Sequence, residues 1–448
     1  MKYPFLAVLG FSVLSMVLAP ASAHAQSGSG GPTFEEAMAA FNYGDNDLAV
    51  RHFMRIANEG DARAQYFLAY MMDAGLGMGK DIHNAAGWYE KSAKQDYLPA
   101  MVYMGYIKSA GHGTTRNDKE AFKWYTRAAQ MGDPIAQNNL ATMLRAGKPY
   151  TKDLKLAAQW FLQSAMQGNM RAQYNLATMY RKGEGVARPN MEQAMRWYTY
   201  AANQGDMYAQ NALGYMYFKG EGVEKKDLGM SLEWYRRAAE QGHQSSQMAL
   251  ARMYERDKDF ENAAIWYFHS AEKGDENAMF ALGRLYLLGT ADGERGLKRD
   301  PKSACDWYRK AAEEKNHLPS MVRLGRCYEK GEGVRKPDKT KAGNWYRRAA
   351  DAGDAEGMLE MARIYEDGTG IDKNLQQAYK WYLLAAKWAT ADAEEAKIAA
   401  VKARTQIGTR LTAMEREYAQ VEASTWKPFV VPTYGRVARE SPNLYEEQ

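Results

Sequence analysis

Hydrophobic, small and polar residues recur along this chain in the same order, at a helical period, copy after copy. A Trp followed by Tyr or Phe occurs nine times, and the steps between the tryptophans are 36, 36, 37, 37, 32, 41, 38 and 36 residues. A period of this size is typical of proteins built from stacked structural repeats. The tryptophans are Trp88, Trp124, Trp160, Trp197, Trp234, Trp266, Trp307, Trp345 and Trp381.

Each Trp lies in a predicted amphipathic helix. A small residue stands three positions before it and another five positions after it, as with Ala85 and Ala93 around Trp88. At 100° per residue, we expect the Trp and the aromatic residue after it to share one buried stripe with these small residues. The small side chains would let a neighbouring helix approach closely.

The start of this helix is marked by Asp or Asn seven residues before every Trp. These side chains can accept hydrogen bonds from the free N–H groups of a first helical turn, so the sequence predicts nine N-caps. A role as ligands or catalytic carboxylates is disfavoured, because the same residue type recurs in every copy. The positions are Asp81, Asn117, Asp153, Asn190, Asp227, Asp259, Asp300, Asp338 and Asn374.

Another predicted helix precedes each of these caps and carries the signature L-[AG]-x-x-[YM], as in Leu68-Ala69 or Leu324-Gly325. Glycine-rich turns such as KGEGV at 182–186 and 330–334 join the two helices. They lack the preceding strand and the third glycine of a phosphate-binding loop. The pattern therefore predicts an all-α chain of nine helix pairs.

The combined pattern, AxxLGxxYxxGxGVxxDxxxAxxWYxxAAxxG, resembles the Sel-one-like repeat family, a branch of the tetratricopeptide superfamily. The resemblance covers nine repeats over about residues 62–390. It implies a right-handed α-solenoid of stacked antiparallel helix pairs, in which the first helices line the concave side. Proteins of this kind are mostly adaptors and scaffolds, which hold a protein or an extended peptide.

The segments outside the repeats have separate expected roles. Residues 1–25 are typical of a secretory signal peptide, with Lys2, an apolar run and a plausible cleavage site at Ala23-His24-Ala25. The run is short for a membrane anchor, which must span about 30 Å of hydrocarbon. We expect a flexible leader at 26–33, an N-terminal capping helix pair at 34–61, C-terminal capping helices at 391–425 and an extended tail at 426–448.

One C-terminal capping helix is expected to start at Thr412, where TAME is a plausible capping box. Met414, Tyr418 and Val421 follow at helical spacing, and this segment should close the open end of the stack.

Export predicts a soluble protein of the periplasm, with secretion outside the cell as the second option.

A row of candidate binding residues follows from the repeat frame. The position two residues after the signature Leu or Met points away from the buried face, toward the concave side, and its last four members are all Arg. Stacked arginines could bind carboxylates or phosphates and so favour an acidic partner. Alternatively, Glu255, Glu329 and Glu366, three residues after three of them, pair with them on their own helices. The row is Tyr70, Tyr106, Thr142, Thr178, Tyr215, Arg252, Arg284, Arg326 and Arg363.

Composition and motifs exclude several functions. The net charge of +5 on 448 residues gives no reason to expect nucleic acid binding. The seven histidines show no metal-ligand spacing, and there is no nucleophile motif, so we expect no cofactor, no metal and no enzymatic activity.

Cys305 and Cys327 form either a disulfide across a loop of about 22 residues or two half-buried thiols. The oligomeric state is left open.

The sequence thus predicts an exported scaffold that binds a protein or extended peptide, with regulation of an envelope complex or sensor as a specialised form of this role. Two alternatives remain: a secreted factor that binds host proteins, and a binder associated with polysaccharide or the cell wall.

Overall fold

The computed structural model describes residues 31–289 and 296–429, apart from the side chain of Asp392. The predicted signal peptide at 1–25, part of the predicted leader (26–30), residues 290–295 and the predicted tail from 430 onward lie outside the described residues. The described chain consists of helices and contains no strand, which confirms the all-α prediction. It forms two compact units, which meet in the sequence between Ala238 and Ala239.

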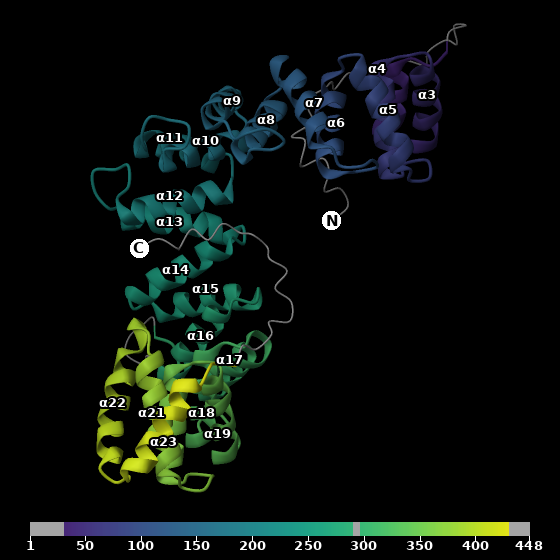
Figure 1. Ribbon diagram of the computed structural model, residues 1–448. Coiled ribbons are helices and arrows are strands. Elements are labelled where there is room, and N and C mark those ends of the chain that lie inside the picture. The colour runs from purple at the N-terminus through teal and green to yellow at the C-terminus, as the bar shows by residue number, and fades with distance from the viewer. Residues whose placement is uncertain (1–30, 290–295, 430–448) are drawn as a thin grey trace. The chain divides into compact units, whose positions relative to one another are not determined.

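Nine helix pairs, here called repeats 1 to 9, make up most of both units (Figure 1). The two helices of a repeat are joined by a turn and pack against each other. In most of the chain, the second helix of one repeat also packs against the first helix of the next repeat. This arrangement confirms the solenoid of helix pairs, whereas the handedness of the superhelix stays a prediction.

The first helices carry the Leu or Met signature. They are α4 (Ala62–Ala74), α6 (Leu98–Ala110), α8 (Pro134–Ala146), α10 (Met170–Lys182), α12 (Met207–Lys219), α14 (Gln244–Arg256), α16 (Glu276–Leu288), α18 (Leu318–Lys330) and α20 (Ala355–Asp367).

The second helices carry the Trp. They are α5 (Ile82–Lys94), α7 (Asp118–Gln130), α9 (Leu154–Met166), α11 (Met191–Asn203), α13 (Leu228–Glu240), α15 (Phe260–Glu272), α17 (Pro301–Lys315), α19 (Lys339–Asp351) and α21 (Leu375–Trp388). A pair α2 (Phe34–Tyr43) and α3 (Asn46–Asn58) precedes repeat 1. The short η2 (Ala391–Ala393), then α22 (Glu394–Gly408) and α23 (Ala413–Thr425), follow repeat 9.

All nine predicted N-caps are confirmed. In each, a side-chain oxygen of the Asp or Asn accepts a hydrogen bond from the backbone N–H three residues later, as with Asp81 and Asn84 at 3.0 Å. The cap fixes where each second helix begins.

The buried stripe of the second helices is shifted by one residue from the prediction. The aromatic residue after each Trp is almost fully buried, as Tyr89 and Tyr308 show, whereas only Trp234 and Trp381 among the nine tryptophans are buried. With 100° per residue, Tyr89 lies between Ala85 and Ala93 on the helix, and the Trp falls at the edge of that stripe. The expectation of nine buried tryptophans was therefore wrong.

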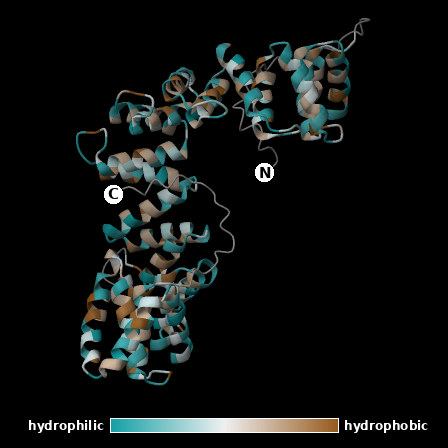
Figure 2. Ribbon diagram, in the orientation of Figure 1, coloured by the Kyte–Doolittle hydropathy of each residue, from teal (hydrophilic) through white to brown (hydrophobic). Residues whose placement is uncertain are grey.

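Hydrophilic and hydrophobic residues are mixed along the helical ribbons (Figure 2). Small residues of the first helices face the buried aromatics. At Gly325, for example, an added Cβ would lie 2.4 Å from Cε1 of Tyr346. The close approach of the two helices therefore depends on the [AG] position of the signature.

The glycine-rich turns connect a repeat to the one before it. A Cβ on Gly185, whose φ is +71°, would lie 2.1 Å from the carbonyl oxygen of Leu154 in the preceding repeat. The residue between the two turn glycines reaches the same repeat: Glu184 pairs with Arg145 at 2.8 Å and Glu221 with Arg181 at 3.1 Å. These pairs fix how one repeat sits on the next.

A ladder of glutamines fills the junctions between helix ends. A buried Gln in the first turn of a first helix donates to a backbone carbonyl eight residues earlier, as Gln173 does to Ala165 at 3.2 Å. Its own side-chain oxygen accepts from a Gln at the end of the same repeat's second helix, as from Gln204 at 2.7 Å. In repeat 6 this last position is Lys273, and the Oε1 atom of the corresponding Gln247 is buried with no hydrogen-bond partner among the described residues.

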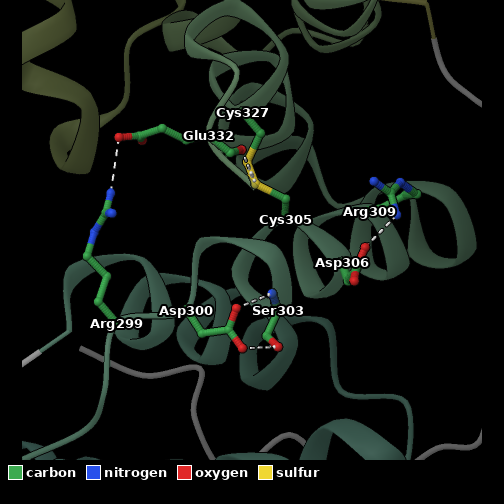
Figure 3. The surroundings of a disulfide bond; sticks show 8 residues. All are labelled: Arg299, Asp300, Ser303, Cys305, Asp306, Arg309, Cys327 and Glu332. Carbon is green, nitrogen blue, oxygen red and sulfur yellow. Dashed lines mark hydrogen bonds and ion pairs between the residues drawn. A yellow bond between two sulfur atoms is a disulfide. The ribbon is translucent and has the colours of Figure 1, made fainter. Parts of the chain in front are cut away.

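Cys305 and Cys327 form a disulfide, which decides between the two alternatives left open by the sequence (Figure 3). The bond links α17 of repeat 7 to α18 of repeat 8, and its Cα atoms lie 6.2 Å apart. Beside it, Glu332 of the next turn pairs with Arg299 at 3.0 Å (Figure 3). A covalent and an ionic link thus hold these two repeats together.

The C-terminal helices only partly match the prediction. The capping box of Thr412 and Glu415 is present at the start of α23. However, Met414, Tyr418 and Val421 are 80%, 58% and 57% exposed, because α23 packs on α21 through its alanines instead. The role of this segment in closing the end of the stack stays a prediction.

Candidate interaction surface

Each first helix has a side that carries the positions two and five residues after the signature Leu or Met. We call these sides together the first-helix surface, and the row of nine candidate residues lies on it. First helices of neighbouring repeats touch, as α6 touches α8 and α18 touches α20. Every one of the nine residues is exposed or half-buried, so none serves only the core. The two units differ in the chemistry of this surface.

In unit 1 the position two residues after the signature carries an uncharged Tyr or Thr in every repeat. The ring of Tyr70 contacts Phe41 edge-on, with centroids 6.1 Å apart, and that of Tyr106 lies 5.5 Å from Tyr103. The guanidinium of Arg181 lies over the ring of Tyr215 at 4.8 Å. These rings are held by neighbours and still reach the surface.

The two threonines of the row use their hydroxyls within the fold. Thr142 donates to the carbonyl of Asn138 at 2.8 Å. Thr178 donates to the carbonyl of Tyr174 at 3.0 Å and shares a hydrogen bond of 2.9 Å with the hydroxyl of Tyr198. Thr178 therefore serves as the partner of a buried Tyr.

In unit 2 the surface is charged and arranged around tyrosine hydroxyls. Tyr267, the buried aromatic of repeat 6, donates its hydroxyl to Glu255 at 2.8 Å. Arg284 of repeat 7 donates to the other oxygen of the same carboxylate. One glutamate thus joins a second helix of its own repeat to a first helix of the next.

Repeats 8 and 9 use the same device at the same position. The hydroxyl of Tyr346 donates to Glu329 at 2.9 Å, and that of Tyr382 donates to Glu366 at 2.8 Å. Burial, followed by these carboxylates, raises the pKa of both tyrosines, so the hydroxyls stay protonated. Arg410, in the turn after α22, lies 3.7 Å from Glu366 and completes the parallel with Arg284.

Glu360 holds two arginines of the row together. Its side chain is almost buried and accepts from Arg326 of repeat 8 at 2.7 Å and from Arg363 of its own helix at 3.0 Å. Arg326 also lies 2.8 Å from Glu356. Each of these arginines is therefore already bound to a carboxylate of the chain.

The ion pairs predicted within single helices are not the ones that form. Glu255, Glu329 and Glu366 bind the tyrosines rather than the arginines three residues before them. A buried hydroxyl needs an acceptor, and the arginine side chain is long enough to reach the neighbouring repeat. Arg252 is exposed and makes no ion pair with any residue that the structure describes.

The repeat pattern did not predict Glu360, or the role of Glu255, Glu329 and Glu366 as tyrosine partners. The signal was present, because the position five residues after the signature Leu or Met holds Glu in three of the last four repeats. The remaining one of these four repeats is repeat 7, which contains Tyr308 and carries Leu287 at that position.

The described residues include no group of His, Cys, Asp or Glu side chains that could hold a metal ion. Over the same ranges, 31–289 and 296–429, no helix combines the length and apolar character needed to span a membrane.

Comparison with known proteins supports a repeat protein. The model of the Sel1 repeat matches nine segments: residues 62–97, 98–133, 134–169, 171–206, 208–243, 244–275, 277–316, 318–354 and 355–387. A comparison with curated proteins found no match.

Among solved structures, the chain is similar to c5321, a protective antigen present in uropathogenic Escherichia coli strains and displaying an SLR fold. The two share 29% identity at a TM-score of 0.66, over 88% of this chain and 84% of that one. A Sel1 repeat protein from Oxalobacter formigenes is 25% identical at a TM-score of 0.45, over 62% of this chain and 96% of that one. With nine matched repeats over most of its length, the chain belongs to the Sel1 repeat family.

Proposed function

We propose that this protein is an exported scaffold that holds a partner protein or an extended peptide on its first-helix surface. A Sel1 repeat solenoid suggests protein–protein interaction in general. The observation that supports the first-helix surface is that one position in each of nine repeats stays outside the core and changes from Tyr or Thr in unit 1 to Arg in unit 2.

The apolar segment at 4–18 and the sites that follow it support export, and the Cys305–Cys327 disulfide fits an oxidising compartment. The periplasm is the proposed location, and regulation of an envelope complex or sensor is the proposed use. Neither a catalytic arrangement nor a cofactor is part of the proposal, and the modest net charge of +5 supports a protein partner over nucleic acid.

Capture of partners tests this proposal. Tagged protein is crosslinked in native cells and isolated from the envelope fraction, and the enriched proteins are compared between wild type and Arg252→Glu. Arg252 is the suitable position because its replacement breaks no ion pair among the described residues. Lys123→Glu, on the exposed side of α7, is the control with the same change in charge.

We expect an enriched protein that is lost with Arg252→Glu and kept with Lys123→Glu. Equal capture by all three forms would contradict binding through the first-helix surface of unit 2. Fractionation separates the alternatives, because a host-directed factor would reach the medium, and a glycan array tests the polysaccharide binder.

A further inference from the structure

Repeat 7 differs from its neighbours in unit 2 at one position of the first-helix surface. Five residues after the signature Leu or Met, repeats 6, 8 and 9 carry Glu255, Glu329 and Glu366. Repeat 7 carries Leu287 there. The surface therefore lacks one carboxylate in an otherwise regular series.

In the other repeats that carboxylate has a defined task. It accepts a hydrogen bond from the buried Tyr of its own repeat, at 2.8 to 2.9 Å. In repeat 6 the same carboxylate also receives the guanidinium of Arg284, which belongs to the next repeat. A tyrosine hydroxyl and an arginine from the next repeat thus form a carboxylate-binding pair.

Repeat 7 keeps the donors of this arrangement and lacks the acceptor. The hydroxyl of Tyr308 forms no hydrogen bond with any described residue, although Tyr308 is almost fully buried, with 1% of its surface exposed. Burial raises the pKa of Tyr308 to about 12, and the charged groups that oppose this rise are Arg323, Arg284 and Arg326. These arginines pair with Glu255, Glu356 and Glu360, and none of these carboxylates accepts a hydrogen bond from the Tyr308 hydroxyl among the described contacts.

The arginines have capacity for a further acceptor. A guanidinium carries five N–H donors. Within the described residues, Arg284 donates to Glu255 through Nη2, and Arg326 donates to Glu356 and Glu360 through Nη2. Both side chains are partly exposed, so their remaining N–H groups can be reached from solvent.

We infer that Tyr308, Arg284 and Arg326 form a binding site for the carboxylate of an Asp or Glu side chain of the partner protein. The partner's carboxylate takes the place that a glutamate of the chain itself occupies in repeats 6, 8 and 9. Tyr308 donates its hydroxyl to it, and the two guanidiniums supply charge-assisted hydrogen bonds. The inference deepens the proposed function, on which it rests, by assigning the charge and the position of one anchor.

The decisive variant supplies the missing carboxylate from the chain itself. In Leu287→Glu the new side chain should accept from Tyr308, as Glu255 accepts from Tyr267, and should block the site. Leu287→Gln makes nearly the same change in shape without the charge. Leu288→Glu adds the same charge at the adjacent exposed residue and controls for the general electrostatic effect.

The probe is a fluorescent hexaglutamate peptide, acetylated and amidated so that it carries side-chain carboxylates only, and binding is followed by fluorescence anisotropy. We expect Leu287→Glu to weaken binding about tenfold or more, and Leu287→Gln and Leu288→Glu to change it less than about threefold. Tyr308→Phe should weaken it several-fold, which keeps the test valid if Leu287→Glu does not fold, as judged by circular dichroism.

Equal binding by Leu287→Glu and Leu288→Glu, or unchanged binding by Tyr308→Phe, would overturn the site. A hexaalanine peptide with a free C-terminus serves as the second probe, and preference for it over hexaglutamate would also overturn the assignment to side chains. The peptide result is independent of the partner capture described above. A partner captured equally by wild type and Leu287→Glu would contradict the inference alone, whereas failure to capture any partner would contradict the proposed function alone.

Discussion

Tyr267 donates its hydroxyl hydrogen to Glu255 at 2.8 Å, from the second helix of repeat 6 to the first. Because Arg284 of repeat 7 binds the same carboxylate, this contact joins the interior of one repeat to the surface of the next. Burial and the neighbouring Glu255 raise the pKa of Tyr267, so the hydroxyl remains a donor at physiological pH.

Removing that hydroxyl should destabilise unit 2. Tyr267→Phe deletes a hydrogen bond to a charged acceptor, and we expect the free energy of unfolding to fall by about 1.5 kcal/mol. Tyr308→Phe is the matched control, because Tyr308 makes no hydrogen bond with the described residues, and it should change the free energy by less than about 0.5 kcal/mol. Urea unfolding followed by circular dichroism measures both, and equal losses would refute the role assigned to Glu255.

The glutamine ladder predicts a stabilising substitution. Lys273→Gln should supply the donor that Gln247 Oε1 lacks within the described ranges, as Gln204 does for Gln173 at 2.7 Å, and should raise stability by about 1 kcal/mol. The reverse change, Gln204→Lys, should lower stability by a similar amount. Thermal unfolding of the two variants tests the idea, which fails if both shift the midpoint in the same direction.

The disulfide should contribute substantially to stability. It closes a loop with a sequence separation of 22 residues, and in the chain-entropy model such a loop stabilises by about 3 kcal/mol. Cys305→Ser combined with Cys327→Ser should therefore lower the unfolding midpoint. Reductant should lower the midpoint of the wild type and leave that of the double variant unchanged. A wild type insensitive to reductant, with its thiols shown to be free, would contradict this prediction.

Two glycines within helices should respond in opposite ways to the same substitution. Gly325→Ala places a Cβ 2.4 Å from Tyr346 and should cost about 1 to 3 kcal/mol. Gly87→Ala, in α5, meets nothing within 4 Å and should stabilise by up to about 1 kcal/mol through higher helix propensity. Denaturant midpoints of the two variants provide the comparison, and a neutral Gly325→Ala would mean that helices α18 and α19 are less closely packed than described.

The sequence was sufficient for features that depend on local spacing. The N-caps from Asp81 to Asn374 and the capping box at Thr412 involve a side chain and a backbone N–H three residues away, so a fixed offset predicts them. The nine repeats follow from the same regularity, and the family comparison confirms them.

Features that depend on side-chain direction or reach were predicted less well. A shift of one residue turns a helical side chain by 100°, which is why Tyr89, and not Trp88, fills the core. The partner of Arg284 could not be found from its own helix, because Glu255 lies in the preceding repeat. Likewise, Met414 and Tyr418 have the spacing of a buried stripe, and nothing in their own segment shows that α23 packs through its alanines.

The most direct test of the first-helix surface is crosslinking from defined positions in living cells. A photoreactive amino acid is placed at Thr142 or Arg252 on the first helices, and at Lys123 or Glu313 on the exposed sides of second helices. We predict that irradiation yields a crosslinked partner from Thr142 and Arg252 and none from the two control positions. Crosslinks that form only from Lys123 and Glu313, or equally from all four positions, would contradict the account.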